Sequence, residues 1–122
     1  MKIRILENSV RFRLTRSEVH TLCTKGYIEN QTKFDTNVFA YAVRLVADSE
    51  KLSTQFRNNI VTLNLPQSLG NNWHQTEQVS FSETMNFKNN GSLSLLLEKD
   101  FACLDERLEG QSDNYHNPKV LL

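Results

Sequence analysis

The sequence predicts a single α+β domain, in which a mainly antiparallel sheet of about seven or eight strands curves toward a small barrel and two short helices are inserted. The chain has 122 residues, of which 39% are hydrophobic, so it is long enough for one domain with its own core. Short segments of alternating apolar and polar residues recur between asparagine-rich turns, a pattern typical of hairpins. Two positions also carry signals for the start of a helix.

The first two strands are expected at residues 2–6 and 10–14, joined as a hairpin across residues 7–9. The second of them has one apolar and one basic face, formed by Val10, Phe12 and Leu14 and by Arg11 and Arg13 respectively.

A helix is expected next, at about residues 16–25. Thr15 and Glu18 have the spacing of a capping box, in which each side chain bonds the backbone N–H of the other residue. Gly26 has the usual role of ending the helix, just after Lys25. The apolar face of this helix is formed by Val19, Leu22 and Cys23.

Six more strands follow the same alternating pattern. They are expected at residues 27–34, 38–46, 52–57, 60–65, 79–85 and 92–101. Pro66 begins a second, shorter helix at about residues 66–74, with Leu65, Leu69 and Trp73 spaced to lie on one face. We expect Trp73 to be part of the core.

The domain is expected to span residues 1–104, followed by a polar, acidic tail at 105–122. Net charge is zero, but residues 1–16 hold five basic residues and one acidic residue, whereas residues 98–113 hold six acidic and two basic ones. This asymmetry predicts that the first hairpin lies beside the last strand. Glu98 or Asp100 should then be within ion-pair distance of an arginine of that hairpin.

Composition excludes several classes of protein. The zero net charge argues against a nucleic-acid partner recognised through bulk positive charge. No stretch approaches the 18 apolar residues of a membrane span, and no signal-like segment is present. The two cysteines, Cys23 and Cys103, form no C-x-x-C motif, so a cytoplasmic protein with reduced thiols is expected.

The candidate binding site is a set of alternating charges on the first hairpin and the last strand, where arginine guanidinium groups are suited to phosphate or carboxylate. It consists of Lys2, Arg4, Arg11, Arg13, Glu98 and Asp100. The functional interpretation is a site for an anionic small molecule. The structural interpretation is a solvated sheet face with cross-strand charge pairs.

Few other residues suggest chemistry. Cys103 is either a nucleophile, if a base such as His116 approaches it, or a small buried residue. Cys23 is expected in the core. The three histidines, His20, His74 and His116, are far apart in the sequence, so no metal site is expected, and no motif indicates a cofactor.

Two stretches resemble a family of small bacterial proteins of unknown function. One is Lys2-Ile3-Arg4-Ile5-Leu6-Glu7-Asn8-Ser9-Val10-Arg11-Phe12-Arg13-Leu14-Thr15, and the other is Leu97-Glu98-Lys99-Asp100-Phe101-Ala102-Cys103-Leu104. This resemblance covers most of the chain but implies no activity. A weaker likeness is to the triphosphate tunnel (CYTH) enzymes, antiparallel barrels whose N-terminal strand carries E-x-E-x-K. That signature is absent from the Lys2–Glu7 segment.

Two function classes follow from these observations. The first is a small soluble binding or interaction protein, expected to form a homodimer, because no catalytic set of residues is recognisable. The alternative is a phosphate- or nucleotide-handling enzyme that uses the basic residues of the first hairpin with Glu98 and Asp100. The sequence alone does not decide whether the protein is an enzyme.

Overall fold

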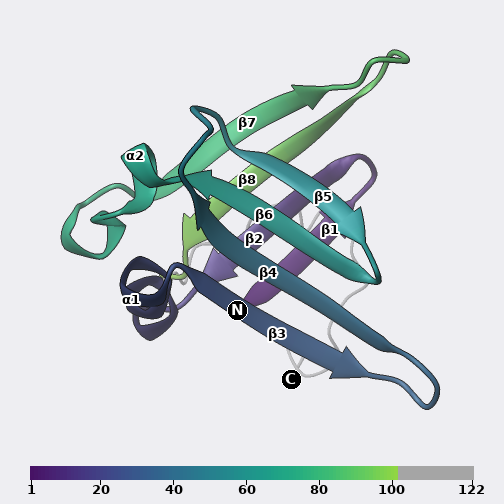
Figure 1. The fold of residues 1–122 in the computed structure, drawn as a ribbon, viewed down its shortest axis with the longest axis horizontal. Coiled ribbons are helices and arrows are strands. Elements are labelled where there is room, and N and C mark those ends of the chain that lie inside the picture. The colour runs from purple at the N-terminus through teal and green to yellow at the C-terminus, as the bar shows by residue number, and fades with distance from the viewer. Residues whose placement is uncertain (102–122) are drawn as a thin grey trace, which may run out of the picture.

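The computed structural model describes residues 1–101, which form two four-stranded sheets packed face to face (Figure 1). One sheet has the strand order β1-β2-β8-β7, and the other has the order β3-β4-β6-β5. The strands are β1 (Lys2–Leu6), β2 (Ser9–Leu14), β3 (Tyr27–Lys33), β4 (Val38–Val46), β5 (Ser53–Arg57), β6 (Ile60–Pro66), β7 (Ser80–Asn86) and β8 (Ser92–Lys99). The helices are α1 (Arg16–Lys25), α2 (Gln67–Gly70) and the 3₁₀ turn η1 (Trp73–Gln75).

The α+β class and the eight strands are confirmed, but the strands do not form a closed barrel. The expected single curved sheet is instead divided into two mixed sheets. Residues 105–122, predicted as a tail, lie outside the described residues, as do Cys103 and His116.

Each sheet is made of two hairpins joined through their second strands. The four hairpins are antiparallel, whereas β2 pairs in parallel with β8 and β4 pairs in parallel with β6. Parallel neighbours need a long connection between them, and here the intervening chain supplies it. Between β2 and β8 the chain builds the whole other sheet. Between β4 and β6 it forms the edge strand β5.

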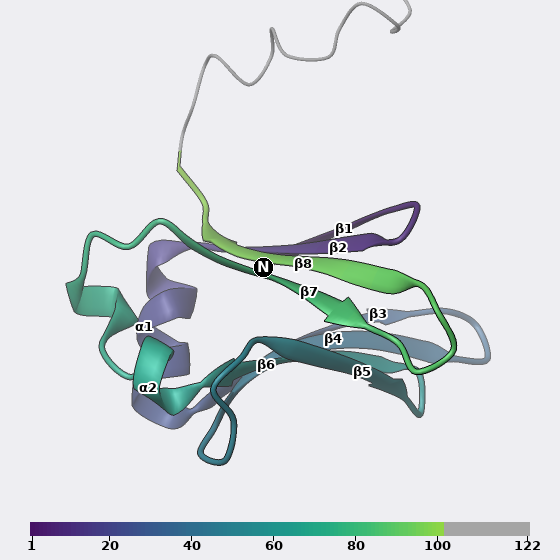
Figure 2. The same cartoon turned by 90° about the horizontal axis from the view of Figure 1, so that it is seen from above.

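All four hairpin turns lie at one end of the molecule, and the helical connections lie at the other (Figure 2). We call these the hairpin end and the helix end. Turn residues at the hairpin end have a positive φ, which asparagine and glycine adopt at low cost. They include Asn58, Asn59, Asn90 and Gly91. The asparagine-rich turns predicted from the sequence are therefore real turns.

The core fills the space between the two sheets. Alternation along β2 turns Phe12 and Leu14 inward, where both are fully buried, and leaves the arginines on the outer face. The other buried apolar side chains come from both sheets and from the helix end. They include Val19, Leu22, Val43, Leu52, Val61, Leu63, Leu65, Trp73, Leu95 and Leu97. Each such side chain contributes about 1.5–3 kcal/mol by leaving water.

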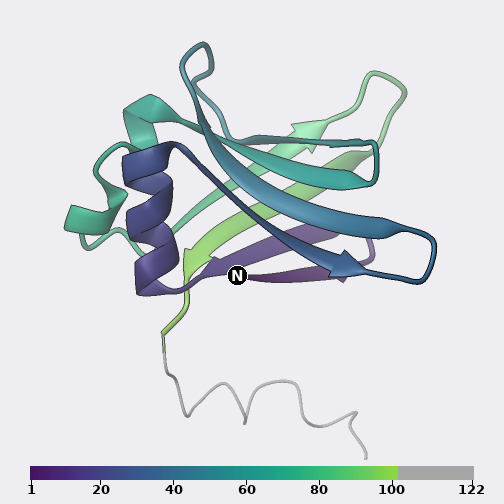
Figure 3. The same cartoon turned by 60° about the horizontal axis from the view of Figure 1, so that its bottom comes forward.

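Helix α1 links β2 of one sheet to β3 of the other and packs across the helix end (Figure 3). Its predicted limits and capping box are confirmed: Glu18 N–H bonds Thr15 Oγ1, and Thr15 N–H donates to Glu18 Oε1 at 2.8 Å. Gly26 ends the helix with a φ of 79°. Val19 and Leu22 are buried, and Cys23 packs against the core, donating to the carbonyl of Gly70.

The two predicted short helices are confirmed as α1 and α2, but the second is shorter than the predicted residues 66–74. Leu65 and Pro66 belong to strand β6, α2 is a single turn, and η1 follows after Asn71 and Asn72. Glycine and asparagine are weak helix formers, so nothing in this segment sustains a longer helix. Trp73 is fully buried as expected, but Leu69 is 43% exposed. None of the helices in residues 1–101 is long and apolar enough to cross a membrane.

Gly70 is required by a close approach between α2 and strands β4 and β6. A Cβ at this position would lie 2.9 Å from Leu45 Cδ2 and closer still to Leu65 Cδ2. We expect Gly70→Ala to lower the free energy of unfolding by about 1–3 kcal/mol through overpacking, although alanine is the better helix former. Urea unfolding measures this. The exposed Ser68→Ala in the same turn is the control, and a Gly70→Ala variant as stable as wild type would contradict the packing.

Glu18 makes the stability of α1 depend on pH. Partial burial works to raise its pKa, but hydrogen bonds from the Met1 ammonium and Thr15, together with the charge of that ammonium, hold the pKa below the ordinary value of 4.5. A lowered carboxyl pKa stabilises the fold above pH 4.5, and this contribution is lost as the pH falls through the folded-state pKa.

We therefore expect Glu18→Gln to destabilise the protein at pH 7 by about 0.5–1 kcal/mol and to converge with wild type in acid. Thermal unfolding between pH 7 and pH 3 measures both effects. Glu50→Gln, at an exposed position with no ion pair to residues 1–101, is the control. A constant difference between Glu18→Gln and wild type across this pH range would contradict the prediction.

Candidate functional site

The predicted charged set lies on the outer face of the β1-β2-β8-β7 sheet. The strand register places Lys2 opposite Arg13 and Arg13 opposite Glu98, so these three side chains form one row across the sheet. Arg4 and Arg11 face each other in the next row. Asp100 follows the end of β8, and its N–H donates to the carbonyl of Leu14 at 2.8 Å.

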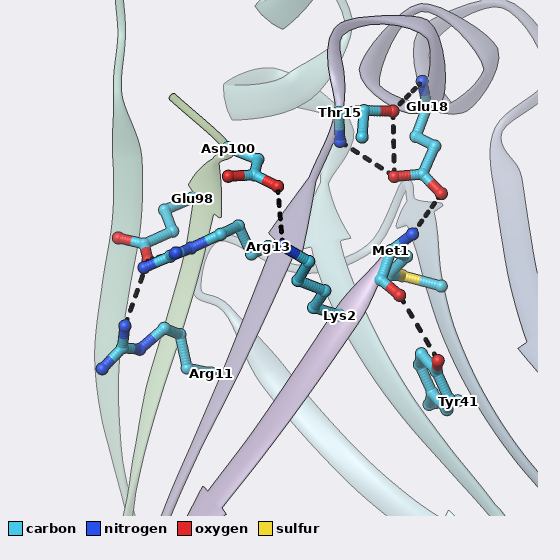
Figure 4. A network of polar contacts seen from close by, with 9 residues as sticks. All are labelled: Met1, Lys2, Arg11, Arg13, Thr15, Glu18, Tyr41, Glu98 and Asp100. Atoms are coloured by element: carbon cyan, nitrogen blue, oxygen red, sulfur yellow. Dashed lines mark hydrogen bonds and ion pairs between the residues drawn. The ribbon is translucent and has the colours of Figure 1, made fainter. Parts of the chain in front are cut away.

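Glu98 is the centre of this charged row (Figure 4). Its Oε1 accepts from Arg13 Nε at 3.0 Å and from Arg13 Nη2 at 2.8 Å, and Arg11 Nη1 lies 3.5 Å away. Lys2 Nζ lies 3.5 Å from Asp100. The predicted proximity of the first hairpin and the last strand is therefore confirmed. Arg4 is exposed and forms no ion pair within residues 1–101.

This arrangement favours the structural interpretation of the charged set. Glu98 is only 19% exposed and is shared by two guanidinium groups, so its charge is already neutralised within the sheet. A triphosphate tunnel requires a closed barrel, which residues 1–101 do not form. The use of Lys2, Arg4, Arg11 and Arg13 to bind an anion stays a prediction.

A pocket of 610 Å³ opens at the helix end, and we call it the helix-end pocket. It is formed where β2 ends, α1 begins, η1 packs against α1 and the chain leaves β8. Its lining residues are Leu14, Arg16, Val19, His20, His74, Thr76, Glu77, Lys99, Asp100 and Phe101. Only Asp100 belongs also to the charged set predicted from the sequence. The volume falls within the usual range of small-molecule sites.

Trp73 supports one wall of the helix-end pocket. The indole is fully buried, donates to the carbonyl of Gln78 at 2.8 Å and meets Phe81 edge to face at 5.1 Å. Lys99 lies 5.6 Å above the indole and donates from Nζ to the carbonyl of Thr76 at 2.7 Å. The ammonium of Lys99 is therefore held in place by the wall.

Two histidines meet in the helix-end pocket. The rings of His20, on α1, and His74, on η1, lie edge to face with their centres 5.2 Å apart. Nδ1 of His74 is buried and has no hydrogen-bond partner, which is uncommon for a buried polar atom. Within residues 1–101, no three histidine, cysteine or acidic side chains are grouped closely enough to hold a metal ion.

Arg16 and Lys99 are the arginine and lysine of this pocket, and neither has an acidic partner within residues 1–101, but only Lys99 is held by the wall. Arg16 is the first residue of α1, its side chain is exposed, and no carboxylate in residues 1–101 lies within ion-pair distance of it. Phe101, which is 55% exposed, supplies apolar surface beside it, and the buried Leu14 and Val19 lie beneath. Such a combination can bind the anionic group of a ligand and cover its apolar part.

Sequence reasoning missed this pocket because its residues are brought together only by tertiary structure. His20 and His74 are fifty-four positions apart, and nothing local indicates that α1 packs against η1. The available signal was the spacing of Arg16, Val19 and His20, which places all three on one face of the predicted helix.

A second, smaller cleft of 320 Å³ opens at the hairpin end, between the two sheets. Its lining residues come from all four hairpins and are almost entirely apolar. They are Ile5, Val10, Phe39, Thr54, Gln55, Phe56, Val61, Met85, Phe87 and Leu93. We call it the hairpin-end cleft. The molecule thus presents a polar pocket at one end and an apolar cleft at the other.

A marked pKa shift among the described residues lies outside both pockets. A hydrogen bond from the Tyr27 hydroxyl to Glu29, with partial burial, raises the pKa of Tyr27 to about 12, and the same bond lowers the pKa of Glu29. Gln31 donates to the other oxygen of Glu29 at 2.9 Å. The three residues alternate along one edge strand, so this is a local cluster on β3.

Fold and site together define a two-sheet α+β domain with a mixed-charge pocket at the end covered by its helices. The chain belongs to the family of unknown function DUF7009, whose family model matches residues 1–119. This confirms the resemblance to a family of unknown function, whereas the likeness to triphosphate tunnel enzymes is not supported. No curated protein and no solved structure matches this chain.

Arg13 and Glu98 should be energetically coupled through their hydrogen-bonded ion pair. A double-mutant cycle of Arg13→Met and Glu98→Gln is expected to give a coupling free energy of about 1.5–3 kcal/mol, because a partly buried bond between charged groups is stronger than an exposed one. Denaturant unfolding measures it. The matched cycle of Arg11→Met with Glu98→Gln should give at most about 1 kcal/mol, in line with its longer distance. Additive effects of Arg13→Met and Glu98→Gln would contradict the contact.

Proposed function

We propose that this protein binds a small molecule in the helix-end pocket, and that the ligand has an anionic group and an apolar body. The observation that carries the proposal is the presence, in one pocket of 610 Å³, of an arginine without an acidic partner, two histidines and an apolar wall. Arg16 binds a carboxylate or phosphate ester, and the exposed ring of Phe101 covers the apolar body of the ligand.

The proposal is a binding function, not a catalytic one. Within residues 1–101, no serine or cysteine that could act as a nucleophile lines the pocket beside the histidine pair. Glu98, which the alternative enzyme interpretation requires, is held by Arg11 and Arg13 on another face. We also propose that the protein resides in the reducing cytoplasm, which the free thiol of Cys23 supports.

The test is a thermal-shift and calorimetric comparison of benzoate, decanoate, adenosine monophosphate and inorganic phosphate. We expect saturable stabilisation by at least one of the three probes with an apolar body, and none by inorganic phosphate, which leaves the apolar wall empty. A ligand at 100 times its dissociation constant raises stability by about 2.7 kcal/mol, which such an assay detects.

Arg16→Met should weaken that binding by about tenfold or more, because it removes the guanidinium and keeps the length of the side chain. Arg11→Met, on the outer face of the sheet, is the matched control and should bind as wild type does. Binding that is unchanged in Arg16→Met, or lost in Arg11→Met, would contradict the assignment of the pocket. So would the failure of all three apolar probes to stabilise the wild-type protein.

A further inference from the structure

Apolar side chains are concentrated at the hairpin end, on the opposite side of the molecule from the helix-end pocket. Six of the ten large exposed apolar side chains in residues 1–101 lie beside the hairpin turns. They are Ile5, Leu6, Phe34, Val38, Phe56 and Phe87, each between 42% and 64% exposed. We call these six residues the hairpin-end patch. Three of them, Ile5, Phe56 and Phe87, line the hairpin-end cleft.

The hairpin-end patch is larger than a small ligand needs. Because one aromatic side chain offers ~150–250 Å² of surface, the exposed parts of these six side chains amount to on the order of 600 Å². The cleft of 320 Å³ takes in only half of the patch residues. A standard protein interface buries about 800 Å² on each partner, so the patch supplies most of one interface, and its polar surroundings supply the remainder.

Charges of both signs surround the hairpin-end patch. The exposed charged side chains next to the four turns are Glu7, Lys33, Asp35, Arg57 and Lys88. Within residues 1–101, none of these five forms an ion pair. A strongly acidic or basic partner would meet like charges here. A second copy carries the same charges of both signs, so a twofold arrangement can place acidic groups of one copy against basic groups of the other.

We propose that the hairpin-end patch is the interface of a homodimer formed by two copies of this chain. The apolar side chains form the centre of the interface, and the five charged residues form its rim. The two hairpin-end clefts then face each other and close. The two helix-end pockets point away from the interface, so this inference does not depend on the proposed ligand.

The test is the molar mass of the full chain in solution. Light scattering after size exclusion, over about a hundredfold range of concentration, should give twice the chain mass of 14.1 kDa at the upper end. Phe34→Glu and Phe56→Glu should each raise the dissociation constant of the dimer at least tenfold. Leu69→Glu, at a side chain 43% exposed at the helix end, is the matched control and should remain dimeric.

Phe56 also contacts Phe39, with ring centres 6.4 Å apart, so Phe56→Glu changes packing within the chain as well as the proposed interface. Phe34 lies in a turn and is 63% exposed, so Phe34→Glu tests the interface separately. Circular dichroism establishes that each variant is folded. Hydrogen exchange of the wild type should show protection at the four hairpin turns that increases with concentration.

A wild-type protein that is monomeric at every concentration would overturn the proposal. So would a dimer that both glutamate variants leave intact, or one that Leu69→Glu disrupts equally. A monomer that carries an apolar small molecule in native mass spectrometry would also overturn it, and would assign the hairpin-end cleft to that molecule.

Discussion

The parallel pairing of β2 with β8 is the constraint on which the rest of the structure depends. It joins two hairpins from opposite ends of the described chain into one sheet. On the inner face it brings the side chains of Phe12 and Leu97 together, both fully buried. On the outer face it brings Arg13 to Glu98. Where the two strands end, the backbone N–H of Asp100 donates to the carbonyl of Leu14, and both residues line the helix-end pocket.

The two ends of the molecule differ because they are built from different kinds of connection. At the hairpin end, tight turns leave little chain to cover the space between the sheets, and apolar side chains near the strand tips stay exposed. At the helix end, the longer connections that carry the chain between sheets fold into α1, α2 and η1. These connections bring side chains of several elements over the core, and a polar pocket forms among them. A binding site is therefore expected where the connections have room for chemically varied residues.

Local signals in the sequence predicted the parts of the fold that local energetics control. Thr15 and Glu18 satisfy each other's backbone groups within one turn, so the start of α1 is independent of the rest of the chain. Asparagine-rich turns likewise marked where hairpins begin and end.

The division into two sheets was not predicted, because the alternation of apolar and polar residues along a strand does not depend on which strand lies beside it. The pocket was missed for a related reason: His20 and His74 meet only when α1 and η1 pack. Charge asymmetry did indicate one distant contact, since Arg13 and Glu98 carry opposite charges at the two ends of the described chain.

The sheet order also determines which of the two sheets can form first while the chain is being synthesised. The β3-β4-β6-β5 sheet is continuous in the chain from Tyr27 to Pro66, so it can form as soon as that segment has left the ribosome. The other sheet is split, and one edge of β2 has no pairing partner until β8 has been made. Contacts of such sequence separation are slow to form, since the loop they close is long. During this interval the edge of β2 that later pairs with β8 remains open, and chaperones that bind unpaired strands have their opportunity on this hairpin.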